Sequence, residues 1–260
     1  MAGVMDRLSQ ARDWYLRAVG ALSEDGWRKP SLCANWTASQ VVAHVATGDQ
    51  LVRALVLDAM GKERAGEDLP TDFADRQRRF QAMAAWEPRQ LHDAARTASE
   101  RSLAALTEAM PRPELILKMP FGEVPPRIAA TLRLNEYVIH GHDLLPALDG
   151  PDPVPEWFIP AALPDSINLL MRLHQRSPHK GKAASFHLHR TDGEGEWILR
   201  AQDGQAVAES GHGKADAALR GPGEGLYWVM MGRGAPREHG VEVQGDEALA
   251  AAFKEWFPGP

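Results

Sequence analysis

Apolar residues recur every three or four positions in four stretches of the first 150 residues, the spacing of helices that bury one face. In the first stretch these positions are Met5, Leu8, Ala11, Trp14, Tyr15, Ala18 and Leu22. The predicted helices cover residues 5–22, about 38–61, about 88–110, and a segment that begins near residue 126. Thr37 and Gln40 form a capping-box pattern at the start of the second helix. Because no strong strand pattern separates them, the four helices favour an all-α four-helix bundle with its functional groups pointing inward.

The segment between the second and third helices is highly charged. Residues 62–80, KERAGEDLPTDFADRQRRF, mix both signs of charge. Such a mixture is typical of a solvated surface rather than of a dedicated anion site. We therefore expect a solvated loop that leads into a short helix and serves as scaffold.

The pattern changes at residues 148–157, LDGPDPVPEW, where Gly and Pro indicate a linker. We place a domain boundary near Gly150, which gives an N-terminal domain of residues 1–150 and a C-terminal domain of residues 151–260. A helix is predicted over about residues 155–175. The runs ASFHLHR, EWILRAQ, QAVAE and ADAALRG then alternate like strands of a small antiparallel sheet. The last strand, GVEVQG, lies between the helical pieces GEGLYWVMMGR and DEALAAAFKEWF, so an α+β domain is expected.

The composition of the chain limits the partners, metal ligands and cellular location that we expect. The chain has 29 Lys and Arg residues against 35 Asp and Glu, a net charge of −6 that disfavours a nucleic-acid partner. Cys33 is the single cysteine, so an internal disulfide is excluded and any metal must be held by nitrogen and oxygen. The sequence has no signal-peptide pattern and no apolar run of membrane-spanning length, so a cytoplasmic protein without membrane association is expected.

Three residues of the predicted bundle are candidates for a metal site. Glu136 and His140 are four residues apart, so both project from one helix face, about 6 Å apart along the axis. His44 has apolar residues three and four positions away on either side, which places it on the buried face of the second helix. Two imidazoles and a carboxylate suit Zn²⁺ or another divalent ion. From spacing alone, ordinary hydrogen bonding of these residues remains an equal alternative.

Two longer stretches resemble a known family. PSLCANWTASQVVAHVATGD and FGEVPPRIAATLRLNEYVIHGHDLL are similar to the signature blocks of the mycothiol-dependent maleylpyruvate isomerase family, actinobacterial members of the DinB-like metal-binding four-helix bundles. The resemblance implies that His44, Glu136 and His140 bind a divalent metal ion, expected to be Zn²⁺. It also implies that mycothiol serves as cosubstrate in an enzyme that acts on a small electrophile, by isomerisation or by S-transfer.

The resemblance extends to the C-terminal domain. ALRGPGEGLYWVMMGR and VEVQGDEALAAAF look like a domain similar to sterol carrier proteins. Arg220 and Arg233 fall near the ends of predicted elements, where a guanidinium can hold the carboxylates of an acidic substrate. His187 and His189 alternate onto one side of a strand, but no acidic partner is near them in sequence. We therefore expect a surface pair without metal.

Two further residues of the signature blocks are expected to have roles other than binding the metal. Asp143, one turn beyond His140, is placed to orient that imidazole. Cys33 has no candidate base at a readable spacing, and a structural role is expected. Two other functions remain open: a non-enzymatic protein that keeps a metal for stability and binds a ligand or regulates, and a metal hydrolase that activates water.

Overall fold

The computed structural model describes residues 3–64, 66–119, 121–150 and 154–259. The chain divides into two compact units, Met1–Val154 and Pro155–Pro260. The predicted linker of residues 148–157 includes residues 151–153, which lie outside the described residues. Within the described ranges, no helix is both long and apolar enough to cross a bilayer.

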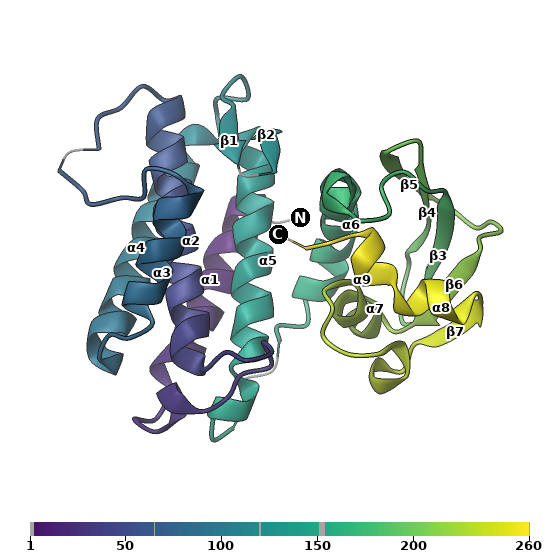
Figure 1. Ribbon diagram of the computed structural model, residues 1–260, viewed down its shortest axis with the longest axis horizontal. Coiled ribbons are helices and arrows are strands. Elements are labelled where there is room, and N and C mark those ends of the chain that lie inside the picture. The colour runs from purple at the N-terminus through teal and green to yellow at the C-terminus, as the bar shows by residue number, and fades with distance from the viewer. Residues whose placement is uncertain (1–2, 65, 120, 151–153, 260) are drawn as a thin grey trace. The chain divides into compact units, whose positions relative to one another are not determined.

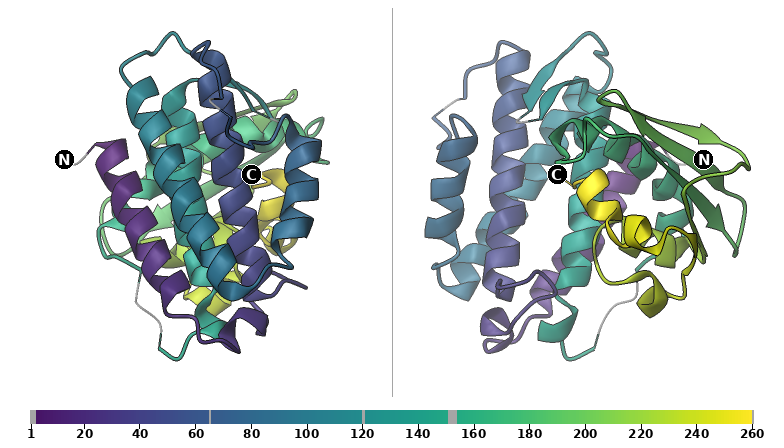
Figure 2. Two further views of the ribbon diagram at one scale, coloured as in Figure 1. Left: turned by 90° about the vertical axis from the view of Figure 1, so that its left-hand side faces the viewer. Right: turned by 45° about the vertical axis from the view of Figure 1, so that its right-hand side comes forward.

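Four long helices make up most of the N-terminal unit and run side by side (Figures 1 and 2). They are α1 (Val4–Gly20), α2 (Ala38–Ala59), α4 (Pro88–Ala109) and α5 (Pro126–Asp143). Helix α2 packs on α4 and α5, and α1 packs on α5. A shorter helix, α3 (Phe73–Met83), packs on α2, and short 3₁₀ turns occupy Gly26–Arg28 and Leu145–Ala147. The predicted bounds of α1, α2 and α4 and the predicted start of α5 are confirmed to within two residues.

The starts of α2 and α5 follow from their first residues. The Thr37 side chain accepts from the backbone N–H of Gln40, and the Gln40 side chain accepts from the backbone N–H of Thr37 at 2.8 Å. This is the predicted capping box, and it is confirmed. Pro126 is the first residue of α5, a position that needs no N–H donor. Most residues of α5 are buried, so the polar side chains of this helix lie inside the unit.

One feature of the N-terminal unit corrects the prediction of an all-α domain. Strands β1 (Leu117–Met119) and β2 (Gly122–Val124) form an antiparallel hairpin before α5. Each strand has three residues, which is too short for an alternation of apolar and polar residues to be recognised. Gly122 has φ 127°, a left-handed conformation that glycine adopts without strain.

The C-terminal unit is an α+β fold with a five-stranded sheet. Its strands are β3 (Ala184–Arg190), β4 (Glu196–Gln202), β5 (Gln205–Ser210), β6 (Ala217–Gly221) and β7 (Glu242–Gly245), in the order β5-β4-β3-β6-β7. Every predicted strand is present. However, β3 and β6 pair in parallel, so the sheet is mixed and the prediction of an antiparallel sheet is wrong.

The parallel pair arises because residues 211–216 cross one face of the sheet. The N–H of Gly211 donates to the carbonyl of Glu196 at the start of β4, and the N–H of Asp216 donates to the carbonyl of Ser185 at the start of β3. Between them, a Cβ at Gly213 would lie 3.4 Å from the side chain of Ile198. We call residues 211–216 the crossing segment. Strand lengths alone do not distinguish such a crossing from a tight hairpin.

Helices cover one face of this sheet (Figure 1). They are α6 (Phe158–Leu173), α7 (Gly223–Met230), α8 (Glu247–Ala251) and α9 (Phe253–Trp256), with short 3₁₀ turns at His174–Arg176 and Pro236–His239. The ring of Phe186 packs on those of Phe253 and Phe257. Because side chains alternate along a strand, His187 and His189 of β3 point to the opposite face, which carries the crossing segment.

Candidate metal centre

Helices α2 and α5 bring the three predicted metal ligands together. The Nε2 atom of His44 lies 3.2 Å from Oε2 of Glu136, and Nε2 of His140 lies 3.6 Å from the same oxygen. One ligand atom from each residue lies within 4.8 Å of the other two. Glu136 and His140 are buried, whereas 22% of the His44 side chain is exposed. The group is therefore accessible from one side.

The orientation of His140 suits a metal ligand. Its Nδ1 atom lies 2.9 Å from Oδ2 of the fully buried Asp143, so Nδ1 donates and the lone pair of a neutral ring is left on Nε2. That lone pair faces Oε2 of Glu136, and two acceptors at this distance need a proton or a cation between them. Burial lowers the pKa of His140, but hydrogen bonds with Asp143, Cys33 and Glu136 hold it well above its usual value. Without a metal, the ring therefore carries a proton at this position.

His44 is held differently, by Arg76 of α3. The Nη2 atom of Arg76 donates to Nδ1 of His44 at 3.1 Å and to the backbone carbonyl of His44 at 3.0 Å. Arginine can only donate, so Nδ1 accepts and Nε2 carries the hydrogen that points to Glu136. Burial lowers the pKa of His44 to about 4, against the opposing effect of Glu136. For Nε2 to bind a metal, the hydrogen must move to Nδ1 while Arg76 keeps only its carbonyl bond.

Glu136 is charged despite its burial. Burial raises the pKa of its carboxyl, but hydrogen bonds from His140 and His44 take that pKa well below its usual value. Arg133 lies beneath it, with Nη1 at 3.6 Å from Oε2 of Glu136 and Nε at 3.0 Å from Oδ1 of Asp49. An ionised carboxylate and two imidazoles, with one open side, form a donor set that fits a divalent ion such as Zn²⁺.

The sequence analysis does not place Cys33 or Arg76 in this centre. Cys33 lies with Sγ 2.9 Å from Oδ2 of Asp143 and 3.9 Å from Nδ1 of His140, although no base near Cys33 was expected. The loop that carries Cys33 and the end of α5 are joined where the N–H of Leu32 donates to the carbonyl of Asp143. The second residue is Arg76, which is buried in a segment predicted to be scaffold. The four-residue spacing of Arg76 and Phe80 is the available signal that both share the buried face of α3.

Two aromatic side chains, Trp36 and Phe80, pack beside His44. The ring centroid of Trp36 lies 5.0 Å from that of His44 and 5.1 Å from that of Phe80. The sequence analysis does not assign these two residues to the site.

The arginines predicted to hold substrate lie in the C-terminal unit. Arg220 is on β6, with 48% of its side chain exposed, and its Nη1 atom lies 3.3 Å from the carboxylate of Glu242. Arg233 follows α7 and donates to the carbonyl of Met231 at 3.0 Å. Their role in binding a substrate stays a prediction.

Family models of known proteins match both the N-terminal and the C-terminal part of the chain. The family model for the mycothiol maleylpyruvate isomerase N-terminal domain matches residues 8–145, and the model for the C-terminal domain of the same family matches residues 162–252. The chain belongs to the mycothiol maleylpyruvate isomerase family. The family resemblance predicted from the two signature blocks is thereby confirmed.

Solved structures show that the fold is shared. A crystal structure of the mycothiol-dependent maleylpyruvate isomerase is 19% identical to this chain, with a TM-score of 0.66, and the match covers 94% of this chain and 93% of that one. A histidine-to-alanine mutant of the isomerase gives the same TM-score and coverage at 18% identity. No curated protein sequence matches the chain. The predicted likeness of residues 151–260 to sterol carrier proteins stays a prediction.

Proposed function

We propose that this chain is a metal-dependent enzyme that uses mycothiol to act on a small electrophile, as an isomerase of the maleylpyruvate type. The observation that carries the proposal is the convergence of His44, Glu136 and His140 from α2 and α5, inside the region that matches the family. The packing of α1, α2, α4 and α5 supports a DinB-like four-helix bundle as its frame. A single cysteine agrees with a cytoplasmic location.

His44, Glu136 and His140 would hold the divalent ion, with Zn²⁺ as the expected ion. When bound, such an ion stabilises the thiolate of a thiol that is mostly protonated near neutral pH. Asp143 fixes His140 with Nε2 directed into the site. Glu136 supplies the negative charge that brings a cation into an interior where an unpaired charge is costly.

The surroundings of the centre suit an anionic nucleophile. Trp36 and Phe80 pack beside His44 and give that side of the centre an apolar surface. Arg76 is buried next to the same imidazole and adds a positive charge within the site. A thiolate placed there is less solvated than in water, which raises its reactivity toward an electrophilic carbon.

The chemistry of isomerisation follows from addition and expulsion. The thiolate sulfur forms a bond to one carbon of an activated double bond. The electron pair of that double bond moves onto the activating carbonyl as an enolate, so the bond between the two carbons becomes single. After rotation about that bond, the C–S bond breaks, the double bond returns in the other geometry, and the thiol is released unchanged. Arg220 and Arg233 are the proposed partners of the substrate carboxylates. If the enolate instead takes up the proton that the thiol gave up and the thiol is not expelled, the same addition gives S-transfer.

The test is turnover of maleylpyruvate and related electrophiles by the purified protein, with and without mycothiol. Isomer formation that requires mycothiol without consuming it supports the proposal, whereas net thiol consumption identifies an S-transferase. Thiol-independent hydrolysis identifies a metal hydrolase, and binding without turnover identifies a ligand-binding or regulatory protein. Each of these three results replaces the isomerase proposal.

Glu136→Gln tests the metal in the same assay. A neutral amide is a weaker ligand for Zn²⁺ than a carboxylate, so this variant should lose the ion of the N-terminal centre and its turnover. Glu108→Gln is the matched control, because Glu108 pairs with Lys62 on the surface. Elemental analysis measures the metal content of the folded Glu136→Gln variant. A content equal to that of the unchanged protein would show that Glu136 is not a metal ligand.

A further inference from the structure

A second group of metal-binding side chains lies in the C-terminal unit, on the sheet face that carries the crossing segment. His187 and His189 come from β3, Glu196 is the first residue of β4, and His212 belongs to the crossing segment. One ligand atom from each of the four lies within 4.8 Å of the other three. The sequence analysis expects no acidic partner for the two strand histidines. That expectation is wrong, because strand pairing places Glu196 directly opposite His189.

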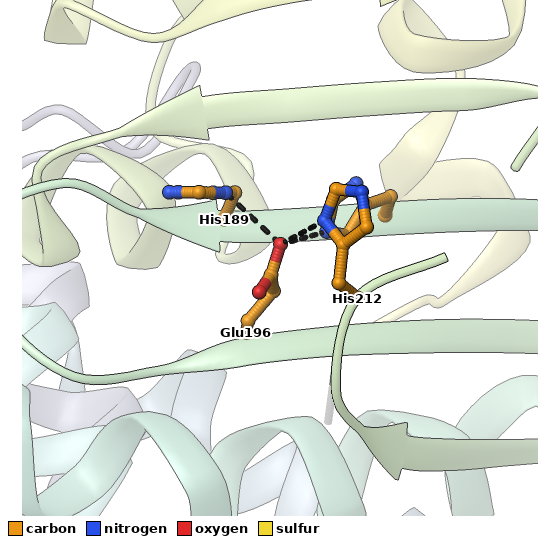
Figure 3. A group of neighbouring side chains, drawn as sticks. His189, Glu196 and His212 are labelled. Atoms are coloured by element: carbon orange, nitrogen blue, oxygen red, sulfur yellow. Dashed lines mark hydrogen bonds and ion pairs between the residues drawn. The ribbon is translucent and has the colours of Figure 1, made fainter. Parts of the chain in front are cut away.

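The three imidazoles converge on one carboxylate oxygen. Oε1 of Glu196 lies 2.8 Å from Nε2 of His187, 3.0 Å from Nδ1 of His189 and 2.7 Å from Nδ1 of His212. Figure 3 shows His189 and His212 approaching this oxygen from two sides. A carboxylate oxygen offers about two lone-pair positions, so three N–H donors on one oxygen exceed what it accepts with good geometry. A cation bound by three ring nitrogens and the carboxylate would satisfy all four groups at once.

The backbone fixes most of this arrangement in advance. His187 and His189 are two residues apart on β3 and so point to the same face, and Glu196 is held opposite them by the β3–β4 ladder. Gly211 brings His212 to the cluster, since its N–H donates to the carbonyl of Glu196. Gly211 has φ 132°, a conformation that strains any residue with a Cβ.

Burial and charge within the cluster suit a cation that enters from solvent. His187 is 7% exposed, while the side chains of Glu196, His189 and His212 are 27%, 38% and 78% exposed. A glutamate carboxylate is charged near neutral pH, so the cluster offers a negative charge to a cation. It is open on the side of His212.

The three N···O distances to Glu196 are close to the ligand spacing of a tetrahedral site. Ligand atoms on a tetrahedral Zn²⁺ with bonds of about 2.0–2.1 Å lie about 3.3 Å apart. The three N···O distances to Glu196 are a few tenths of an ångström shorter than this. The exposed His212 side chain has room to withdraw by such an amount. Three nitrogens and one oxygen suit Zn²⁺ and its neighbours Co²⁺, Ni²⁺ and Cu²⁺ rather than Mg²⁺ or Ca²⁺.

We propose that His187, His189, Glu196 and His212 form a second divalent-metal site, separate from the candidate centre of the N-terminal unit. Four protein ligands leave no open position, which is typical of a structural rather than a catalytic site. The ion ties the crossing segment to β3 and β4. It therefore stabilises the C-terminal unit without taking part in turnover.

The test uses the full chain with its N-terminal centre removed by His44→Ala and Glu136→Gln. After chelation and dialysis, this variant is titrated with Zn²⁺ by calorimetry and with Co²⁺ by visible absorption, which reports a tetrahedral site. One ion of each metal should bind per chain. Circular dichroism establishes that the variant is folded. A folded variant that binds neither ion overturns the proposal.

Two further substitutions locate the ion. In the same background, His212→Ala should weaken Zn²⁺ binding at least about tenfold, by analogy with the loss of a supporting residue. His179→Ala is the matched control, because His179 also pairs with a glutamate, Glu255 at 3.1 Å, outside the cluster. Equal binding by the two variants overturns the proposal. In the otherwise unchanged chain, His212→Ala should lower the bound zinc by one ion per chain. An unchanged zinc content would also overturn the proposal of a second site.

Discussion

Oδ2 of Asp143 lies 2.9 Å from Nδ1 of His140, inside a unit where Asp143 is fully buried. This contact decides which nitrogen of His140 faces Glu136. In the proposed enzyme it also raises the basicity of the nitrogen that binds the metal.

Asp143→Asn should therefore weaken metal binding by about 10–100-fold, because an amide orients the ring but brings no negative charge. The measurement is competition with a chelator of known affinity. Asp149→Asn serves as control, since Asp149 is 81% exposed and pairs with Lys29. Equal affinity in the two variants would show that Asp143 does not support the ligand.

Cys33→Ser should keep turnover and metal content. The serine hydroxyl can donate to Oδ2 of Asp143 as the thiol of Cys33 does, and the proposed nucleophile is the thiol of mycothiol rather than of the chain. Rates measured at saturating mycothiol should stay within a few-fold of the unchanged protein. Loss of all turnover in a folded, metal-loaded variant would make Cys33 a catalytic residue.

Gly141→Ala should destabilise the N-terminal unit by about 1–3 kcal/mol, the usual cost of overpacking a core. A Cβ at Gly141 would lie 2.2 Å from Cζ3 and 2.8 Å from Cη2 of Trp14, so α1 and α5 must move apart. Urea unfolding measures the loss. Gly150→Ala is the control, because a Cβ at Gly150 meets nothing within 4 Å. In a Trp14→Phe background the cost of Gly141→Ala should shrink, since phenylalanine lacks the second ring, and an undiminished cost would place the strain elsewhere.

Glu67→Gln should lower the free energy of unfolding by about 1 kcal/mol at pH 7, the range of a well-formed surface ion pair. The carboxylate of Glu67 accepts from Nε of Arg53 at 2.8 Å and from Nη1 of Arg101 at 3.1 Å. The hydrogen bond from Arg53 has the largest effect on the pKa of Glu67 and lowers it below its usual 4.5.

The pH dependence of this difference has a fixed sign. A carboxyl with a lowered folded-state pKa stabilises the fold above its unfolded-state pKa, and this contribution is lost as pH falls through the folded-state pKa. The free energies of unfolding of the unchanged protein and of Glu67→Gln should therefore show their full difference above pH 4.5. The two values should converge as the pH falls below the lowered pKa of Glu67. Unfolding in urea between pH 7 and pH 3 gives the comparison, with the exposed Glu63 as Glu63→Gln control. A difference that persists at the lowest pH would assign the effect to packing.

Patterns over a few consecutive residues predict those features of this protein that residues close in sequence determine. The capping box of Thr37 and Gln40 fixes the start of α2, and the four-residue spacing of Glu136 and His140 fixes their common face. Apolar residues three and four positions away place His44 on the buried face of α2, and the family resemblance then implies that it binds a metal together with Glu136 and His140. These features can be read from the sequence because each needs only helix geometry.

Contacts between distant elements are not predicted in the same way. Arg76 reaches His44 because α3 packs on α2. The spacing of Arg76 and Phe80 indicates a shared face of α3, but it does not show which residue of α2 that face meets. His212 reaches Glu196 only because the crossing segment runs over the sheet. Strand patterns give neither the order of strands nor the path between them, so the mixed sheet and its histidine cluster come from the structure.

The parallel pairing of β3 with β6 also bears on how the chain folds. It joins Phe186 to Ala217, and contacts over roughly 30 intervening residues form more slowly than hairpins because a longer loop must close first. During synthesis, β3, β4 and β5 leave the ribosome before β6, so one edge of β3 exposes unpaired N–H and C=O groups in the meantime. Such an open edge can pair with another chain. The nascent C-terminal unit is therefore most prone to aggregation just before residue 217 emerges.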